Sequence, residues 1–317
     1  MPRLPTALLL IAALALPASA AAAPALGVSD QNAQTFSDPL FAPAKIKLAR
    51  YITPYDVVSD PVQNAKLAAW VDAARAANQR ILISFEHSRK SRSAAAKAPS
   101  AAAYRKALTA FKAQYGSRVQ EISPWNEVNR KFVASRGEGQ PIWNRPDLAA
   151  TYYGVARKLF KGKPIVALDI LDQDNVNGAV SYVRRFKAAL KKQKLPSPAI
   201  WGIHPYSDIN RFSTARTKKL LRETKTGRVW LTEASGIVKL LPRFPTSEKR
   251  AAAADRCMFT IGKLDKRIQR TYYYGWYGRP HDVFDSGVVD MTTDTPRLGY
   301  QVVVKRQAGA CKKPKGL

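Results

Sequence analysis

Short apolar segments alternate with longer amphipathic segments along most of the 317-residue chain. The short segments are apolar on both faces of an extended chain, which is typical of parallel strands covered on both sides. The longer segments carry apolar residues at three- and four-residue steps, which predicts helices with one buried face. Strands are predicted at residues 25–30, 45–51, 80–86, 118–125, 163–170, 199–206, 228–234 and 271–278.

Helices are predicted between most of these strands, at residues 64–79, 100–116, 145–162, 178–194 and 247–266. Eight strands separated by helices over this length predict a single-domain (β/α)₈ barrel. The alternative is a doubly wound open sheet, which usually has a glycine-rich phosphate loop after its first strand. Residues 27–38 contain no such loop. The first two strands are also too close in sequence for a full helix between them.

The first 23 residues have the features of a secretory signal peptide. A single Arg3 precedes an apolar core at residues 7–16, and small residues with an A-x-A pattern follow it. Cleavage after Ala20 or Ala23 fits equally well, so the barrel is assigned to residues 24–317, including a short basic C-terminal tail. No later stretch is apolar over a length that would cross a bilayer. These features predict a secreted protein without a membrane span.

The chain contains two cysteines, Cys257 and Cys311. In an oxidising compartment an isolated pair usually forms a disulfide, which here would link the C-terminal tail to an earlier helix. Metal ligation is the alternative, but it requires further Cys or His residues nearby. We therefore predict a disulfide and expect neither a metal nor a cofactor.

The formal net charge is +29, or +28 once Arg3 is removed with the signal peptide. Such a charge attracts anionic partners, for example a cell-wall polymer. The basic residues are spread along the chain without interleaved aromatic residues, so no dedicated nucleic-acid site is indicated. Solvated helix faces explain the charge better than a dedicated polyanion site, and a monomer is expected.

Polar residues stand where the predicted strands end, and in a barrel these carboxyl ends surround the active site. Glu127 follows the fourth strand and Glu233 ends the seventh. The basic Arg130 lies three positions after Glu127. The other candidates at strand ends are Arg50, His87, Asn126, Asp169, Asp172, His204, Tyr206 and Trp276, whereas Glu86 is expected to face the helices and pair there.

Two carboxylates on one rim can cleave a glycosidic bond, one as the acid and the other as nucleophile or base. Retention requires them to be about 5–5.5 Å apart, and inversion about 6.5–9.5 Å. A cation such as Arg50 and a hydroxyl donor such as Tyr206 favour an ionised nucleophile. Asn126 can bind a sugar hydroxyl, and Trp276 offers a flat face for a sugar ring.

These residues resemble clan A of the glycoside hydrolases, particularly family 5 and its relatives. The resemblance rests on "WNE" at 125–127, "HPY" at 204–206, "LTE" at 231–233 and the tryptophan of the last strand. It implies a retaining enzyme in which Glu127 is the acid/base and Glu233 the nucleophile. Asn126 would bind the sugar 2-hydroxyl. The supporting residues would be Arg50, His87, His204, Tyr206 and Trp276.

Each of these assignments has a structural alternative. Glu127 and Glu233 could be buried ion-pair partners of Arg50, and His204 could be a hydrogen-bonded core histidine. Asp169 and Asp172 could extend the site or form an outer salt bridge. The substrate expected from the resemblance is a β-linked polysaccharide or oligosaccharide. The rival functions are a catalytically silent carbohydrate-binding barrel and a polyanion-binding wall protein.

Overall fold

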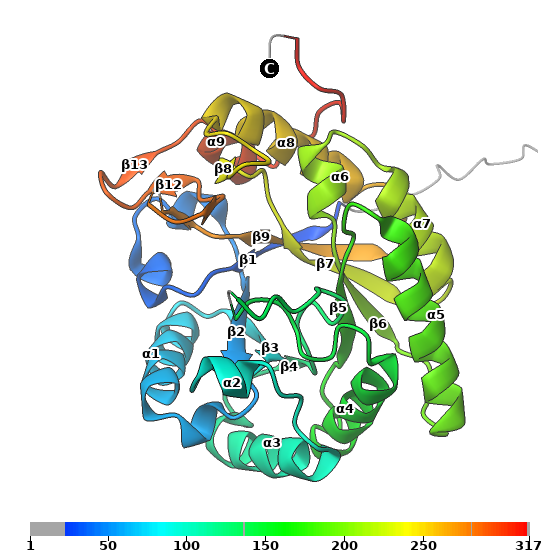
Figure 1. Ribbon diagram of the computed structural model, residues 1–317. Helices are drawn as coiled ribbons and strands as arrows, with labels where there is room; N and C mark the ends of the chain where they lie inside the picture. The colour runs from blue at the N-terminus through cyan, green and yellow to red at the C-terminus, as the bar shows by residue number, and fades with distance from the viewer. Residues whose placement is uncertain (1–22, 136, 280, 316–317) are drawn as a thin grey trace, which may run out of the picture.

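The computed structural model describes residues 23–135, 137–279 and 281–315 and contains a barrel of eight parallel strands (Figure 1). The strands neighbour one another in the order β4-β3-β2-β1-β9-β7-β6-β5, and an Ile122–Ile165 bridge joins β4 to the chain entering β5. The predicted (β/α)₈ fold is therefore confirmed. The strands are β1 (Ala25–Ser29), β2 (Leu48–Pro54), β3 (Arg80–Glu86), β4 (Glu121–Ser123), β5 (Val166–Leu171), β6 (Ile200–His204), β7 (Arg228–Ala234) and β9 (Ile268–Tyr274).

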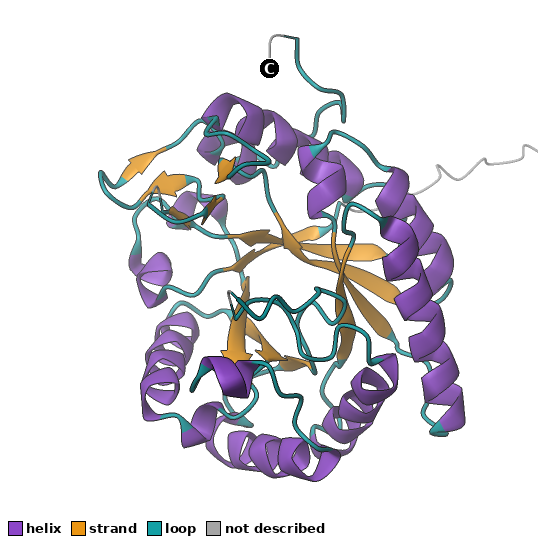
Figure 2. Cartoon of the chain, viewed as in Figure 1, coloured by secondary structure: helices purple, strands orange, loops and turns teal. Residues whose placement is uncertain are grey.

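Helices surround this barrel (Figure 2). The long ones are α1 (Pro61–Ala76), α3 (Ala101–Tyr115), α4 (Pro146–Leu159), α5 (Val176–Lys192), α7 (Ala215–Thr224) and α8 (Glu248–Ile261). Between β1 and β2 the described chain forms only the 3₁₀ helices η1 (Ala33–Ser37) and η2 (Ala42–Ala44), as the short spacing predicted. The remaining short helices are η3 (Val57–Ser59), α2 (Arg92–Ala95), α6 (Tyr206–Asn210) and α9 (Tyr300–Val304).

Capping side chains define where several helices begin. Asp60 accepts a hydrogen bond from the backbone of Gln63 at the start of α1, and Ser100 does the same for Ala103 at the start of α3. Such caps satisfy backbone N–H groups that have no partner within the helix. Pro61 and Pro146 occupy the first turns of α1 and α4, where a missing N–H has no cost.

Strand ends differ from the predicted ones where proline or glycine intervenes. β4 ends at Ser123 because Pro124 has no N–H to donate to a neighbouring strand. β9 ends at Tyr274 because Gly275 turns the chain with a φ of 77°. Trp276 therefore lies beyond the last barrel strand and not at its end.

The barrel interior has an apolar layer and a polar layer. The apolar layer consists of Leu82, Val166, Ile200, Trp230 and Tyr272. Two residues further along several strands, the inward positions carry polar side chains that are fully buried, namely Ser84, Ser123 and Thr232. Because inward residues alternate along a strand, this polar layer lies closer to the carboxyl ends and supports the site there.

The loops that follow β7 and β9 contain small sheets that the sequence pattern did not predict. They are formed by β8 (Lys239–Leu240) with β11 (Phe284–Asp285), and by β10 (Tyr277–Gly278), β12 (Val289–Asp290) and β13 (Thr295–Pro296). Two-residue strands are too short to show any periodicity. These loops build up one side of the barrel mouth.

The predicted disulfide between Cys257 of α8 and Cys311 of the C-terminal tail is present. Among the described residues, no helix combines the length and apolar character needed to cross a membrane. The predicted signal peptide lies outside the described residues except for Ala23.

Candidate active site

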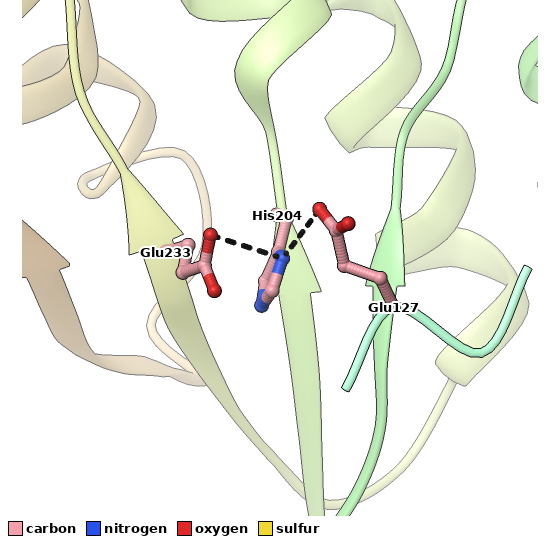
Figure 3. Close-up of side chains that lie close together, drawn as sticks. All are labelled: Glu127, His204 and Glu233. Atoms are coloured by element: carbon pink, nitrogen blue, oxygen red, sulfur yellow. Dashed lines mark hydrogen bonds and ion pairs between the residues drawn. The ribbon is translucent and has the colours of Figure 1, made fainter. Parts of the chain in front are cut away.

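Glu127, His204 and Glu233 converge at the carboxyl ends of their strands (Figure 3). Nδ1 of His204 lies 3.3 Å from Oε1 of Glu127 and 3.8 Å from Oε2 of Glu233. One oxygen of each carboxylate and this nitrogen all lie within 4.8 Å of one another. The two carboxylates therefore face each other across the barrel mouth, one on either side of His204 (Figure 3).

A tight turn after β4 presents Glu127 to the barrel mouth. Glu127 has a φ of 44°, and its carbonyl accepts a 2.8 Å hydrogen bond from the backbone N–H of Arg130. Asn129 fixes this turn to β5, because its side chain exchanges two hydrogen bonds with the backbone of Leu171. The unusual backbone conformation is thus held by the surrounding structure, as is common at functional sites.

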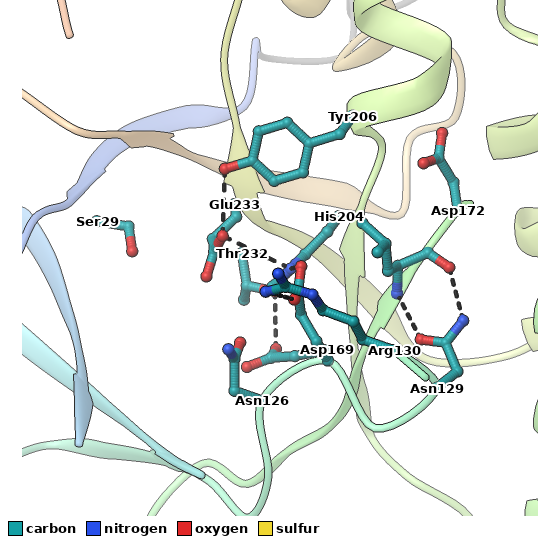
Figure 4. A network of polar contacts seen from close by, with 12 residues as sticks. Ser29, Asn126, Asn129, Arg130, Asp169, Asp172, His204, Tyr206, Thr232 and Glu233 are labelled. Carbon is teal, nitrogen blue, oxygen red and sulfur yellow. Dashed lines mark hydrogen bonds and ion pairs between the residues drawn. The ribbon is translucent and has the colours of Figure 1, made fainter. Parts of the chain in front are cut away.

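Arg50 holds the other glutamate, Glu233, from inside the barrel, and Figure 4 shows the hydroxyl of Tyr206 directed at the same carboxylate. Its guanidinium is fully buried and donates to Glu233 at 2.7 Å, to Asn126 at 2.8 Å and to Asp169 at 2.8 Å. The Tyr206 hydroxyl donates to the second oxygen of Glu233 at 3.1 Å. Arg50 lies in the middle of β2 and not at its end as predicted. Its long side chain nevertheless reaches Glu233.

Asp169 belongs to this network, whereas Asp172 does not. The carboxylate of Asp169 is fully buried and accepts hydrogen bonds from Ser84, Ser123 and Thr232 in addition to Arg50. Burial raises the pKa of Asp169, but Arg50 and His204 outweigh burial and lower it. Asp172 instead accepts from the backbone N–H groups of Ser207 and Asp208, and so fixes the start of α6.

The surroundings of the two glutamates shift their pKa values in opposite directions. Burial raises the pKa of Glu127, but His204 and the guanidinium of Arg130 outweigh burial and lower it to about 2. Burial also raises the pKa of Glu233, and the nearby charge of Glu127 adds to this effect against His204 and Arg50. Burial lowers the pKa of His204, but the neighbouring carboxylates raise it overall. Without substrate, Glu127 is therefore held as the anion.

Arg130 also contacts Glu127, although it lies beyond the strand end and was not predicted to belong to the site. Its guanidinium lies 3.3 Å from Oε2 of Glu127 and 3.6 Å from Oε2 of Glu138. The sequence showed a basic residue three positions after Glu127, but only the turn geometry brings its side chain back over the carboxylate. Tyr274 was also missed, and its ring lies 6.4 Å from that of Tyr206.

Two predicted site residues, Trp276 and His87, hydrogen-bond neither glutamate within the described chain. Trp276 is fully buried, with its ring against Phe41 and its Nε1 donating to Asp38 at 2.8 Å. The expectation that it offers a face to a sugar ring is therefore wrong, because the turn at Gly275 carries it away from the mouth. His87 contacts the backbone oxygen of Ser88 and, within the described chain, hydrogen-bonds neither glutamate.

A cavity of about 360 Å³ lies beyond the ends of β1 and β9, and neither glutamate lines it. Tyr274 and Phe284 line it, and the rings of both also contact Tyr206, the donor to Glu233. Polar residues also line the cavity, including Asp30, Gln31, Asn32, Arg279 and Asp282. Its lining thus combines aromatic and hydrogen-bonding side chains, as small-molecule pockets commonly do.

Glu127, His204 and Glu233 are also the residues that could together hold a metal ion. However, Arg50 and Arg130 each contact one of these carboxylates, and both guanidinium groups would repel a cation.

The barrel is similar to solved structures of glycoside hydrolases with little sequence identity. A GH10 endoxylanase from a sugarcane soil metagenome gives a TM-score of 0.60 at 14% identity, covering 90% of this chain and 96% of that one. Xylanase 10B of Thermotoga petrophila RKU-1, in complex with xylobiose, gives 0.63 at 11%, covering 89% and 94%. A fungal β-1,4-galactanase gives 0.64 at 14%, covering 90% and 100%. No protein-family model and no curated protein matches the sequence. At these identities the similarity shows a shared fold.

Proposed function

We propose that the protein is a secreted, retaining glycoside hydrolase that acts on β-linked glycans. The observation that carries this proposal is the approach of Glu127 and Glu233 to within 4.8 Å at the barrel mouth. Arg50, Tyr206 and Asn126 surround the pair as this chemistry requires. The predicted signal peptide and the disulfide support export to an oxidising compartment.

In the first step, Glu233 attacks the anomeric carbon while Glu127 gives a proton to the leaving oxygen. Arg50 and Tyr206 hydrogen-bond the carboxylate of Glu233 and hold it in place for the attack. Asn126 binds the 2-hydroxyl of the sugar, because Arg50 occupies its amide oxygen and leaves its amide nitrogen as a donor.

In the second step, Glu127 removes a proton from the water that releases the sugar from Glu233. His204 and Arg130 favour the ionised form of Glu127, which is the form that acts as a base. A sugar hydroxyl can replace water in this step and would make the same site a transglycosylase.

The cavity beside Tyr274 is proposed to bind sugar on the non-reducing side of the scissile bond. It is large enough for part of a glycan, and the rings of Tyr274 and Phe284 that line it contact Tyr206, the donor to Glu233. Similar barrels include a xylanase bound to xylobiose and β-1,4-galactanases, so β-linked xylose and galactose polymers are the first substrates to test.

Covalent labelling tests this proposal directly. The purified mature protein would be incubated with 2,4-dinitrophenyl 2-deoxy-2-fluoro-β-glycosides of xylose, galactose and glucose and then weighed intact. We expect one added fluoroglycosyl mass, mapped to Glu233 and absent from Glu233→Gln. Glu223→Gln is the matched control, because Glu223 pairs with Arg184 and Lys187 on the outer helices, away from the site. A label on any residue other than Glu233 would contradict the proposed mechanism.

A further inference from the structure

Arg130 is held in place by its backbone while its charged end remains accessible. Its N–H donates to Glu127, and its carbonyl accepts a 2.9 Å hydrogen bond from the N–H of Gln140. Gln140 is fixed in turn by the indole of Trp125, at 2.8 Å. Nevertheless, 47% of the Arg130 side-chain surface is exposed, compared with 9% for Glu127. Of the two groups in this contact, the guanidinium is therefore the one that solvent and substrate can reach.

The position of Arg130 relative to the two oxygens of Glu127 indicates which part of a substrate it would meet. Oε1 of Glu127 faces His204, on the side of Glu233, while Oε2 faces Arg130. A leaving group that receives its proton from Glu127 must therefore pass close to Arg130. Because the guanidinium contacts carboxylates on both sides, Glu127 and Glu138, it is already arranged to bind carboxylate groups.

This contact opposes the first step of the proposed reaction. An acid catalyst must carry a proton near its working pH, but His204 and Arg130 together keep Glu127 ionised. The other charged groups facing the carboxylates are Arg50, Asp169 and Glu233. Of the cations that contact Glu127, Arg130 is the exposed one, and so a substrate can withdraw it without disturbing the buried network.

We propose that Arg130 recognises an anionic group on the leaving-group side of the scissile bond, and that this binding draws the guanidinium away from Glu127. The substrate class is then a glycan with an acidic residue, such as a uronic acid, next to the bond that is cleaved. This inference rests on the proposed glycosidase function and identifies its substrate class. Arg130 would then be one residue through which the strongly basic chain binds anions.

The test compares two substrates that differ by one charge. Their sugar is the one that labels Glu233, and their leaving groups are 3-carboxyphenyl and 3-carbamoylphenyl, two phenols of similar acidity. For the wild-type protein we expect kcat/KM to be about tenfold higher for the carboxylate, the size of effect expected for a charge-assisted hydrogen bond. The alkaline limb of the kcat profile should also lie at higher pH for the carboxylate, because withdrawal of Arg130 raises the pKa of Glu127.

Three variants separate recognition from a structural role. Arg130→Gln should lose the preference, and Arg130→Lys should keep part of it. Arg184→Gln, which removes the same charge from an exposed pair with Glu223 on the outer helices, should behave as wild type. Equal kcat/KM values for the two substrates, or a preference that survives in Arg130→Gln, would overturn the inference while the labelled Glu233 still supports the glycosidase. Absence of labelling with every sugar would overturn both.

Discussion

At the scale of single residues, Glu127 and Glu233, the proposed acid/base and nucleophile, differ in their partners. Replacing Glu127 with Ala removes the proposed proton donor but leaves Arg50 and Tyr206 on Glu233. We expect kcat/KM to fall by about 10²–10⁴ for unactivated glycosides, the usual contribution of general acid catalysis. The loss should be much smaller for 2,4-dinitrophenyl glycosides, which need no proton to leave. Equal losses for both substrates in steady-state assays would show that Glu127 has another role.

Replacement of Arg50 should destabilise the fold, because its positive charge pairs with both Glu233 and Asp169 in the buried interior. Arg50→Met leaves both carboxylates without their cation, and we expect a loss of about 3–5 kcal/mol in the free energy of unfolding. Adding Asp169→Asn removes one of the uncompensated charges and should restore part of the stability. Urea denaturation at neutral pH measures this, and a double variant no more stable than Arg50→Met would show that the charges are not coupled.

At the scale of elements, Asp255 on α8 gives stability a pH dependence. Its carboxylate accepts from the N–H of Gly236 after β7, and burial raises its pKa to about 8. The folded state therefore holds a proton that the unfolded chain releases near pH 4, and stability falls as the pH rises from about 4 to 8. Asp255→Asn keeps an acceptor for Gly236 and should be less sensitive to pH over this range.

Thermal unfolding at pH 5 and pH 8 checks the sign of this effect. Relative to wild type, Asp255→Asn should gain more stability at pH 8 than at pH 5. The control is Asp147→Asn, because Arg145 hydrogen-bonds that exposed carboxylate and lowers its pKa. Its removal should be neutral or slightly destabilising at pH 8. An unchanged pH dependence in Asp255→Asn would mean that another group carries it.

The elements also show what the sequence could predict. Alternating apolar segments were enough to predict the eight barrel strands, since each one buries residues on both faces. Glu127 and Glu233 were predictable as neighbours because the carboxyl ends of barrel strands meet at one rim. Trp276 was misplaced because a single glycine turn shifts the end of β9. Arg130 was not assigned because only the φ of 44° at Glu127 brings its side chain back to the site.

At the scale of the whole molecule, the net charge of +29 should act independently of the active site. Basic residues are distributed along the sequence, so binding to an anionic polysaccharide should depend on total charge and weaken with salt. Retention on an immobilised polyuronate should fall by about tenfold or more between low and high salt, as counterion screening predicts.

The same experiment distinguishes general attraction from recognition at the site. Glu233→Gln should be retained at least as strongly as wild type, since the substitution removes a negative charge and leaves every basic residue. Arg184→Gln should elute slightly earlier than wild type because it removes one positive charge, and Arg130→Gln should elute earlier still because it also removes the proposed contact with a uronate. Only Arg130→Gln should also change the preference between charged and neutral leaving groups. Loss of retention in Glu233→Gln alone would instead place the polyanion in the catalytic site.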